Sequence, residues 1–114
     1  MNDRTSASPY PYIGPALMRM PIEQALMRVV DPEVALSIVD VGLVYGVTVA
    51  DGRLHAVITM TSAACPVTDL ILEDVETALD RVAPEGFEIA VELVWEPAWS
   101  PDRMSPRAKA FMGW

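Results

Sequence analysis

Cys65 is the only cysteine in this chain of 114 residues, so no disulfide can form within the chain. A lone thiol is often just a small buried apolar residue. Here Pro66 follows it and a helical pattern begins directly afterwards, which predicts that Cys65 lies at the N-cap of a helix. The free N–H groups and the positive dipole end of a helix N-terminus favour a thiolate. Asp69 and Glu73 partly oppose this effect, so the pattern indicates a reactive thiol without strong activation.

His55 is the only histidine, and it is the obvious candidate for a base that would activate Cys65. It lies close to Asp51–Gly52, a dipeptide typical of a two-residue hairpin turn. The strand from His55 to Thr61 would span about 20 Å, whereas a nucleophile needs its base within about 3 Å. A Cys–His dyad is therefore not expected within one chain, although a swapped dimer would evade this argument. We interpret His55 as a half-exposed strand residue and expect no enzyme.

Metal chemistry is limited by the number of ligands. A stable iron–sulfur cluster usually takes several thiolates, and a structural zinc site takes a full set of Cys or His ligands. This chain has one cysteine and one histidine, so we expect no metal held stably by one chain. A transient iron–sulfur cluster or iron would need carboxylates such as Asp31, Glu33 or Asp40, or ligands from another molecule. A homodimer that shares a cluster between two copies of Cys65 stays open, and such a site would be labile.

Composition narrows the classes of partner. The net charge is −8, from 16 acidic and 8 basic residues, whereas nucleic acids and anionic membranes attract clustered Lys and Arg. The first residues lack the apolar segment of a secretory signal, and no apolar run is as long as a membrane span. We therefore expect a cytoplasmic protein that binds neither nucleic acid nor membrane.

The elements that must position these residues follow from the apolar periodicity. Residues 1–15 show neither a helical nor a strand period, and we expect a disordered lead followed by one domain over 16–114. The expected elements are a helix from Pro21 to just before Pro32, a hairpin over about 38–61, a helix from Pro66 to about Val82, a strand over 87–95 and a short helix starting at Ser105. The order α-β-β-α-β with a short C-terminal helix predicts a small α/β (α+β) domain with helices packed on a three-stranded sheet.

The register of the hairpin can be worked out from its turn. Pairing Ala50 with Arg53 places Val47 opposite Ala56, Tyr45 opposite Ile58 and Leu43 opposite Met60, which makes one face apolar throughout. The other face carries Asp40 and is expected to be mixed and partly exposed. Trp95 ends the third strand and is expected in the core, whereas Trp99 fits packing and partner contact equally well.

Three segments carry a resemblance to a known family. They are DPEVALSIVDVGLVYGV, ITMTSAACPVTDLILEDVETAL and VELVWEPAWSPDRMS, in this order and spacing. Over residues 21–113 the chain resembles the metal–sulfur cluster assembly factor family, the iron–sulfur cluster assembly domain found in SufT and PaaD. The resemblance implies an α/β domain and a role in maturing iron–sulfur or related metalloenzymes. The implied partners are the iron–sulfur assembly machinery and client apoproteins.

The same resemblance assigns candidate site residues. The family's acidic pair matches Asp31 and Glu33, and its Thr/Ser-then-Cys motif matches Thr61, Ser62 and Cys65. Cluster transfer would then use Cys65 as a transient metal ligand. The alternative is a protein-interaction adaptor in which Cys65 is structural.

Overall fold

The computed structural model describes residues 9–61 and 68–113. Its helices and strands, in chain order, are β1 (Tyr12–Ile13), α1 (Ala16–Met27), β2 (Val30–Asp31), β3 (Leu36–Ser37), α2 (Ile38–Val41), β4 (Val44–Ala50), β5 (Arg53–Ile58), α3 (Thr68–Val82), β6 (Glu88–Leu93), a 3₁₀ turn at Pro101–Arg103, and α4 (Pro106–Met112). No helix in these described ranges is long and apolar enough to cross a membrane.

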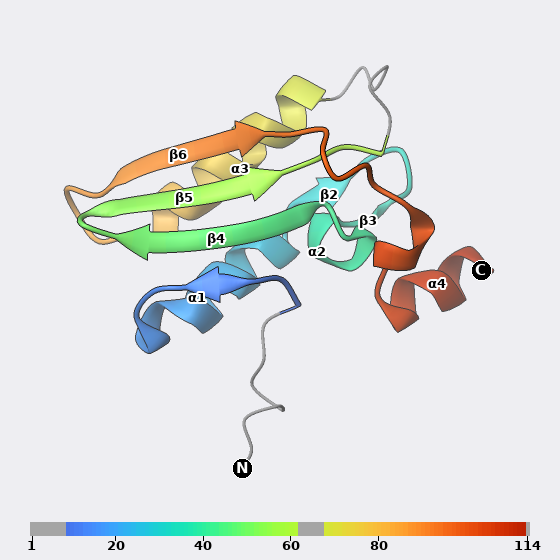
Figure 1. The fold of residues 1–114 in the computed structure, drawn as a ribbon, viewed down its shortest axis with the longest axis horizontal. Coiled ribbons are helices and arrows are strands. Elements are labelled where there is room, and N and C mark those ends of the chain that lie inside the picture. Colours follow the sequence, from blue (N-terminus) through green and yellow to red (C-terminus); the bar gives the residue numbers. More distant parts are fainter. Residues whose placement is uncertain (1–8, 62–67, 114) are drawn as a thin grey trace, which may run out of the picture.

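The main sheet has four strands in the order β1-β4-β5-β6. β4 and β5 are antiparallel, whereas β1 runs parallel to β4 and β6 runs parallel to β5. α1 and α3 lie side by side on one face of this sheet, behind it in the view of Figure 1. The small β2–β3 ribbon, α2 and α4 lie beyond one end of the sheet (Figure 1). The molecule is thus a small α+β domain, which confirms the predicted fold class.

The core forms where the apolar stripes of α1 and α3 meet the sheet. Ile71, Val75 and Leu79 recur at helical spacing along α3, and all three are fully buried. Leu54, Ala56 and Ile58 alternate along β5 and are buried in the same core. Burying a large aliphatic side chain contributes about 1.5–3 kcal/mol relative to leaving it in water. These two periodicities therefore supply much of the energy that fixes the helices on the sheet.

The predicted hairpin is confirmed between Gly46 and Val57, and its turn residues Asp51 and Gly52 both have positive φ. Beyond Gly46 the predicted register is wrong. Val44, not Tyr45, pairs with Ile58, because a bulge lies between Val44 and Gly46. The bulge turns the apolar Val44 inward, where it is 6% exposed, and lets the Tyr45 hydroxyl donate to the carbonyl of Pro97 at 2.7 Å.

Residues 38–43 were predicted as the start of the hairpin, and this prediction is also wrong. Ile38–Val41 form the short helix α2. The Ser37 hydroxyl caps it by accepting from the N–H of Val39 at 3.1 Å, and Gly42 ends it at φ 88°. All four residues of α2 are buried, including Asp40, which was expected on a partly exposed face.

Smaller differences concern single elements. α1 begins at Ala16 and holds Pro21 inside it, although proline was taken as the helix start. The sheet gains a fourth strand, β1, and Trp95 is 42% exposed instead of lying in the core. The C-terminal helix follows the prediction, with Ser105 as N-cap and Pro106 in its first turn.

The N-terminal lead differs from its predicted disorder over residues 9–15. Tyr10 is only 5% exposed and belongs to the core cluster. The N–H of Val47 donates to the carbonyl of Pro11 at 3.0 Å, next to the pairing of β1 with β4. One aromatic residue and a two-residue strand are too short to show a period, which is why the sequence pattern missed them. Residues 1–8 lie outside the described part of the chain.

Replacing Tyr10 tests how firmly the lead is docked. Tyr10→Ala should lower the free energy of unfolding by about 3 kcal/mol, because a buried aromatic side chain is lost. Tyr10→Phe should cost little or even stabilise the fold, since the buried Tyr10 hydroxyl has no hydrogen-bond partner within residues 9–61 and 68–113. Urea unfolding of both variants checks this pair. Equal stability of the Ala variant and the wild type would show that the lead contributes nothing.

Candidate functional site

Asp31 ends β2, and Glu33 lies in the tight turn that joins β2 to β3. Asp31 is 1% exposed, and its Oδ1 accepts from the backbone N–H of Glu33 at 2.9 Å. Its carbonyl accepts from the N–H groups of Val34 at 3.2 Å and of Ala35 at 2.8 Å. Ala35 adopts a positive φ of 60° to close the turn. Asp31 therefore organises the turn from inside, while the Glu33 residue lies on the exposed side of it.

The second part of the candidate site is the chain that leaves β5. Thr59 is fully buried, and its N–H donates to the carbonyl of Leu43 at 2.8 Å, which ties this exit to the segment after α2. Thr61 follows, half-buried. Figure 1 shows the exit of β5 and the β2–β3 ribbon at the same end of the sheet, opposite the Asp51–Gly52 turn. Ser62 and Cys65, both predicted site residues, lie outside the described residues.

His55 does not join this site. It lies in the middle of β5, half-exposed as predicted, and its Nε2 lies 3.0 Å from Oε1 of Glu92 on β6. Within residues 9–61 and 68–113, no group of three or more His, Cys, Asp or Glu side chains is arranged to hold a metal ion. The described part of the molecule therefore presents an acidic turn and a strand exit, without a preformed metal centre.

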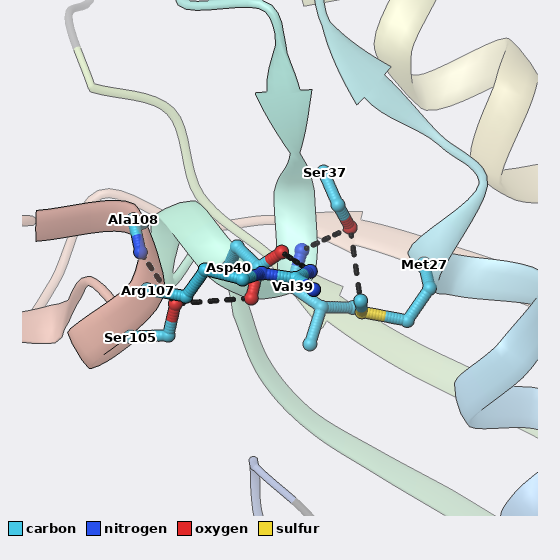
Figure 2. A network of polar contacts seen from close by, with 7 residues as sticks. All are labelled: Met27, Ser37, Val39, Asp40, Ser105, Arg107 and Ala108. Atoms are coloured by element: carbon cyan, nitrogen blue, oxygen red, sulfur yellow. Dashed lines mark hydrogen bonds and ion pairs between the residues drawn. The ribbon is translucent and has the colours of Figure 1, made fainter. Parts of the chain in front are cut away.

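A polar network fixes α2 between the acidic turn and the C-terminal segment (Figure 2). The Asp40 carboxylate accepts from the Ser105 hydroxyl at 3.0 Å and from Nη2 of Arg107 at 2.6 Å. The N–H of Ser105 also donates to the carbonyl of Asp40 at 2.7 Å. The hydrogen bond from Arg107, and then the charge of Asp40, raise the pKa of the guanidinium above its ordinary value. These contacts hold the start of α4 against α2.

On the other side of α2, the network continues toward α1. The Ser37 hydroxyl that caps α2 also donates to Sδ of Met27 at 3.6 Å (Figure 2). Trp99 adds a further contact, because its Nε1 donates to the carbonyl of Val41 at 2.8 Å. Trp99 is thus a packing residue at this place. α2 carries the chain from the acidic turn into β4, so this network determines where the turn sits relative to the sheet.

Sequence reasoning missed Asp40, Ser105 and Arg107 as a unit. One signal was present: Ser37 and Asp40 stand three apart, as in a capping box, and Gly42 follows as a helix stop. The alternation of apolar residues around Asp40 favoured a strand instead. No sequence signal connects Asp40 to Arg107, because their contact depends on the path of the C-terminal segment.

The fold is a four-stranded mixed sheet with two helices on one face. The acidic turn lies at the same end of this sheet as the exit of β5. Residues 19–93 match the model of the family described as "Iron-sulfur cluster assembly protein". The chain belongs to this family, which confirms the resemblance noted from the three sequence segments.

Several members of known name or structure are similar to this chain. It is 43% identical to the Fe-S protein maturation auxiliary factor YitW of Bacillus subtilis, over 78% of this chain and 87% of that protein. It is 42% identical to the Fe-S protein maturation auxiliary factor SufT of Staphylococcus aureus, over 75% of this chain and 97% of SufT. A crystal structure of a domain of unknown function, DUF59, from Bacillus anthracis superposes with a TM-score of 0.78 at 40% identity, covering 85% of this chain and 92% of that domain.

Proposed function

We propose that this protein is a cytoplasmic maturation factor that helps to deliver iron–sulfur clusters or iron to client metalloenzymes. Its partners are then the assembly machinery and the client apoproteins, and it catalyses no metabolic reaction. The observation that carries the proposal is membership of the iron–sulfur cluster assembly family, together with two relatives named as Fe-S protein maturation auxiliary factors.

Cys65 is the residue proposed to contact the cargo. As the single thiol of the chain, it can supply one ligand to a cluster iron and cannot complete a coordination shell alone. The step is a ligand exchange: the Cys65 thiolate replaces one ligand of the donor and is then replaced by a thiolate of the client. No electron is transferred, and the thiol proton leaves when the bond to iron forms and returns when it breaks. Such a site suits handover and not storage.

Asp31, Glu33, Thr61 and Ser62 are proposed to assist at the same place. The buried Asp31 holds the turn in shape, and the turn presents Glu33 at its surface. In the sequence, Thr61 and Ser62 precede Cys65. The exit of β5, which leads to Thr61, lies at the end of the sheet where the acidic turn lies (Figure 1). A carboxylate and hydroxyls near the thiolate could orient the incoming cluster and accept the thiol proton.

The test is the state of iron–sulfur enzymes in cells that lack this protein. We expect several iron–sulfur enzymes to lose activity while their apoprotein levels on immunoblots stay normal. Reconstituting the purified enzymes with iron and sulfide should restore activity, because only the cluster is missing. Normal activity of all such enzymes under iron limitation would rule out the proposed function.

A pure adaptor remains the second candidate, because no metal centre is preformed among the described residues. An adaptor would bring machinery and client together without touching the cluster, and Cys65 would be a structural residue. A homodimer that bridges a cluster between two copies of Cys65 is a third arrangement, and sizing before and after anaerobic reconstitution separates it from the monomer.

A further inference from the structure

The two sides of the main sheet differ in how they are protected from pairing with another strand. β6 forms one edge, and its exposed Glu88 and Glu92 place charge along that edge. On the other side, β4 is separated from solvent by β1 alone. β4 spans Val44–Ala50 and contains neither a proline nor a charged residue, which are the usual protection of an edge strand. β4 therefore has the composition of an interior strand and needs a neighbour.

That neighbour is the docked lead, residues 9–15, whose short strand β1 lies along β4 (Figure 1). Its strand pairing with β4 is limited to the level of Val47 and Thr48. The N–H of Val47 donates to the carbonyl of Pro11 at 3.0 Å, but Pro11 has no N–H with which to bond β4 in return. The lead therefore covers a seven-residue strand with only a two-residue strand of its own.

Two positions in the lead hold it in place by packing. Tyr10 is buried in the core cluster, although its hydroxyl has no hydrogen-bond partner among the described residues. Gly14 passes so close to β4 that an added Cβ would lie 2.8 Å from Cβ of Val49. A buried hydroxyl without a partner weakens the docked state, and a single methyl group at Gly14 would disturb it further. The cover of β4 thus depends on one aromatic ring and one glycine.

The strand beneath the lead is complementary to a second copy of itself. The N–H of Val47 points away from β5 toward the lead, so undocking the lead frees it. An antiparallel pairing centred on Val47 sets Val47 opposite Val47 of the second copy, Gly46 opposite Thr48 and Tyr45 opposite Val49. No charges meet in this pairing, and the β-branched residues suit a sheet. Two copies of β6 would instead bring four carboxylates to one contact.

We infer that the docked lead is a cover for β4, and that β4 of a second copy takes its place in an antiparallel pair when the lead undocks. The two sheets then join into one across a two-fold axis. Because this contact uses the same strand of both copies and the opposite edge is charged, the assembly closes at a dimer.

This dimer differs from one that bridges a cluster between two copies of Cys65. Val44 pairs with Ile58, so the exit of β5 lies at the Val44 end of β4. Antiparallel pairing about Val47 places the two Val44 residues about 20 Å apart along the strands, at 3.3 Å per residue. The inference does not depend on the maturation function, because it uses none of the cluster-transfer residues.

The experiment undocks the lead in the full-length chain by two substitutions. Tyr10→Ala removes the buried ring, and Gly14→Ala places a Cβ against Val49. In sedimentation velocity, the double variant should form a dimer at concentrations at least about tenfold below any at which the wild type does. Tyr10→Phe/Gly86→Ala is the matched control. It keeps the ring, and a Cβ at Gly86 meets no described atom within 4 Å beyond its chain neighbours, so this variant should behave like the wild type.

A charge swap at Thr48 identifies the contact, because Thr48 is exposed and adjoins the centre of the pairing. In the undocked background, Thr48→Glu and Thr48→Lys should each return the chain to monomer, since like charges become neighbours across the axis. An equimolar mixture of the two should form the dimer again. Thermal melts check that every variant is folded. Gly14→Ala alone retains the Tyr10 ring and should dimerise in the same way, which provides the comparison if the double variant unfolds.

Several outcomes overturn the inference. A folded undocked variant that stays monomeric would do so, as would a dimer that persists in both Thr48 variants. Assemblies larger than a dimer would contradict the closed two-fold pair. Equal dimerisation of the wild type and the undocked variant would show that the lead covers nothing. A monomeric undocked variant that binds a synthetic peptide of residues 9–14 would assign this strand to an extended segment of another protein instead.

Discussion

A Cys65→Ser chain should fail to restore iron–sulfur enzyme activity in a deletion strain, although it should unfold at nearly the wild-type temperature. Serine differs from cysteine by one atom and is a preferred residue at a helix N-cap, where the sequence predicts Cys65. Folding therefore loses little. The hydroxyl of serine is not a thiolate and does not ligate iron as cysteine does, so handover should be lost.

Complementation together with a thermal melt measures both halves of this prediction. His55→Gln is the matched control, because His55 lies along β5, away from the strand exit, and this variant should rescue fully. Anaerobic reconstitution gives a second measurement: wild type should gain at most a weakly bound cluster, and Cys65→Ser should gain none. Full rescue by the serine variant would leave the adaptor as the remaining function.

The parts of the fold that were predictable are those with a repeated period or a strong turn signal. The stripe of α3 recurs over four turns, and Asp51–Gly52 fixes a hairpin whose neighbouring pairs follow by counting. The pairs predicted by counting from the turn are wrong beyond Gly46, because a bulge adds one residue to β4 alone. A bulge of this kind does not change the alternation of apolar residues, so the sequence does not reveal it. The predicted apolar stripe of α3 also included Leu70, but Leu70 is 50% exposed because it lies in the first turn of the helix.

The elements that were missed are short and depend on distant contacts. α2 has four residues, too few for a helical period, and its burial depends on a C-terminal segment whose Ser105 is 65 residues away from Asp40 along the chain. β1 has two residues and is defined by its pairing with β4. Local sequence cannot reveal partners at this separation, since the side chains alone do not specify the path between them.

The candidate site was predictable to a different extent. The sequence shows a single thiol, and the spacing of His55 and Cys65 made a Cys–His dyad within one chain unexpected. His55 lies on β5 as predicted, whereas Cys65 lies outside the described residues, so the dyad prediction stays a prediction. Asp31 and Glu33 came from family resemblance, because buried turn carboxylates have no distinctive spacing. The structure adds that Asp31 acts on the turn backbone, whereas Asp40 and Arg107 support the turn through α2. A site of this kind is positioned by a network that no single motif contains.

Gly42→Ala should be the most damaging exchange of a small residue in the described part of the chain. Gly42 ends α2 at φ 88°, where an L side chain costs about 1–2 kcal/mol. A Cβ at this position would also collide with the backbone carbonyl of Arg103, which cannot rotate away as a side chain could. Relief of the collision requires the C-terminal segment to move off α2. The contacts of Trp99 with Val41 and of Arg107 with Asp40 would then weaken together.

We expect Gly42→Ala to lower the free energy of unfolding by about 3 kcal/mol and the melting temperature by roughly 15 °C. Gly52→Ala is the matched control, because Gly52 also has positive φ, 74°, but beyond its two chain neighbours no atom of the described residues lies within 4 Å of a Cβ there. Gly52→Ala should lower the free energy of unfolding by only about 1 kcal/mol, the cost of holding an L residue at positive φ. Limited trypsin digestion reports the undocking directly, since cleavage after Arg103 and Arg107 should accelerate in Gly42→Ala alone. Equal melting temperatures and equal cleavage rates for the two variants would show that the close approach of Arg103 to Gly42 does not hold the C-terminal segment on α2. The position of the acidic turn would then not depend on that approach.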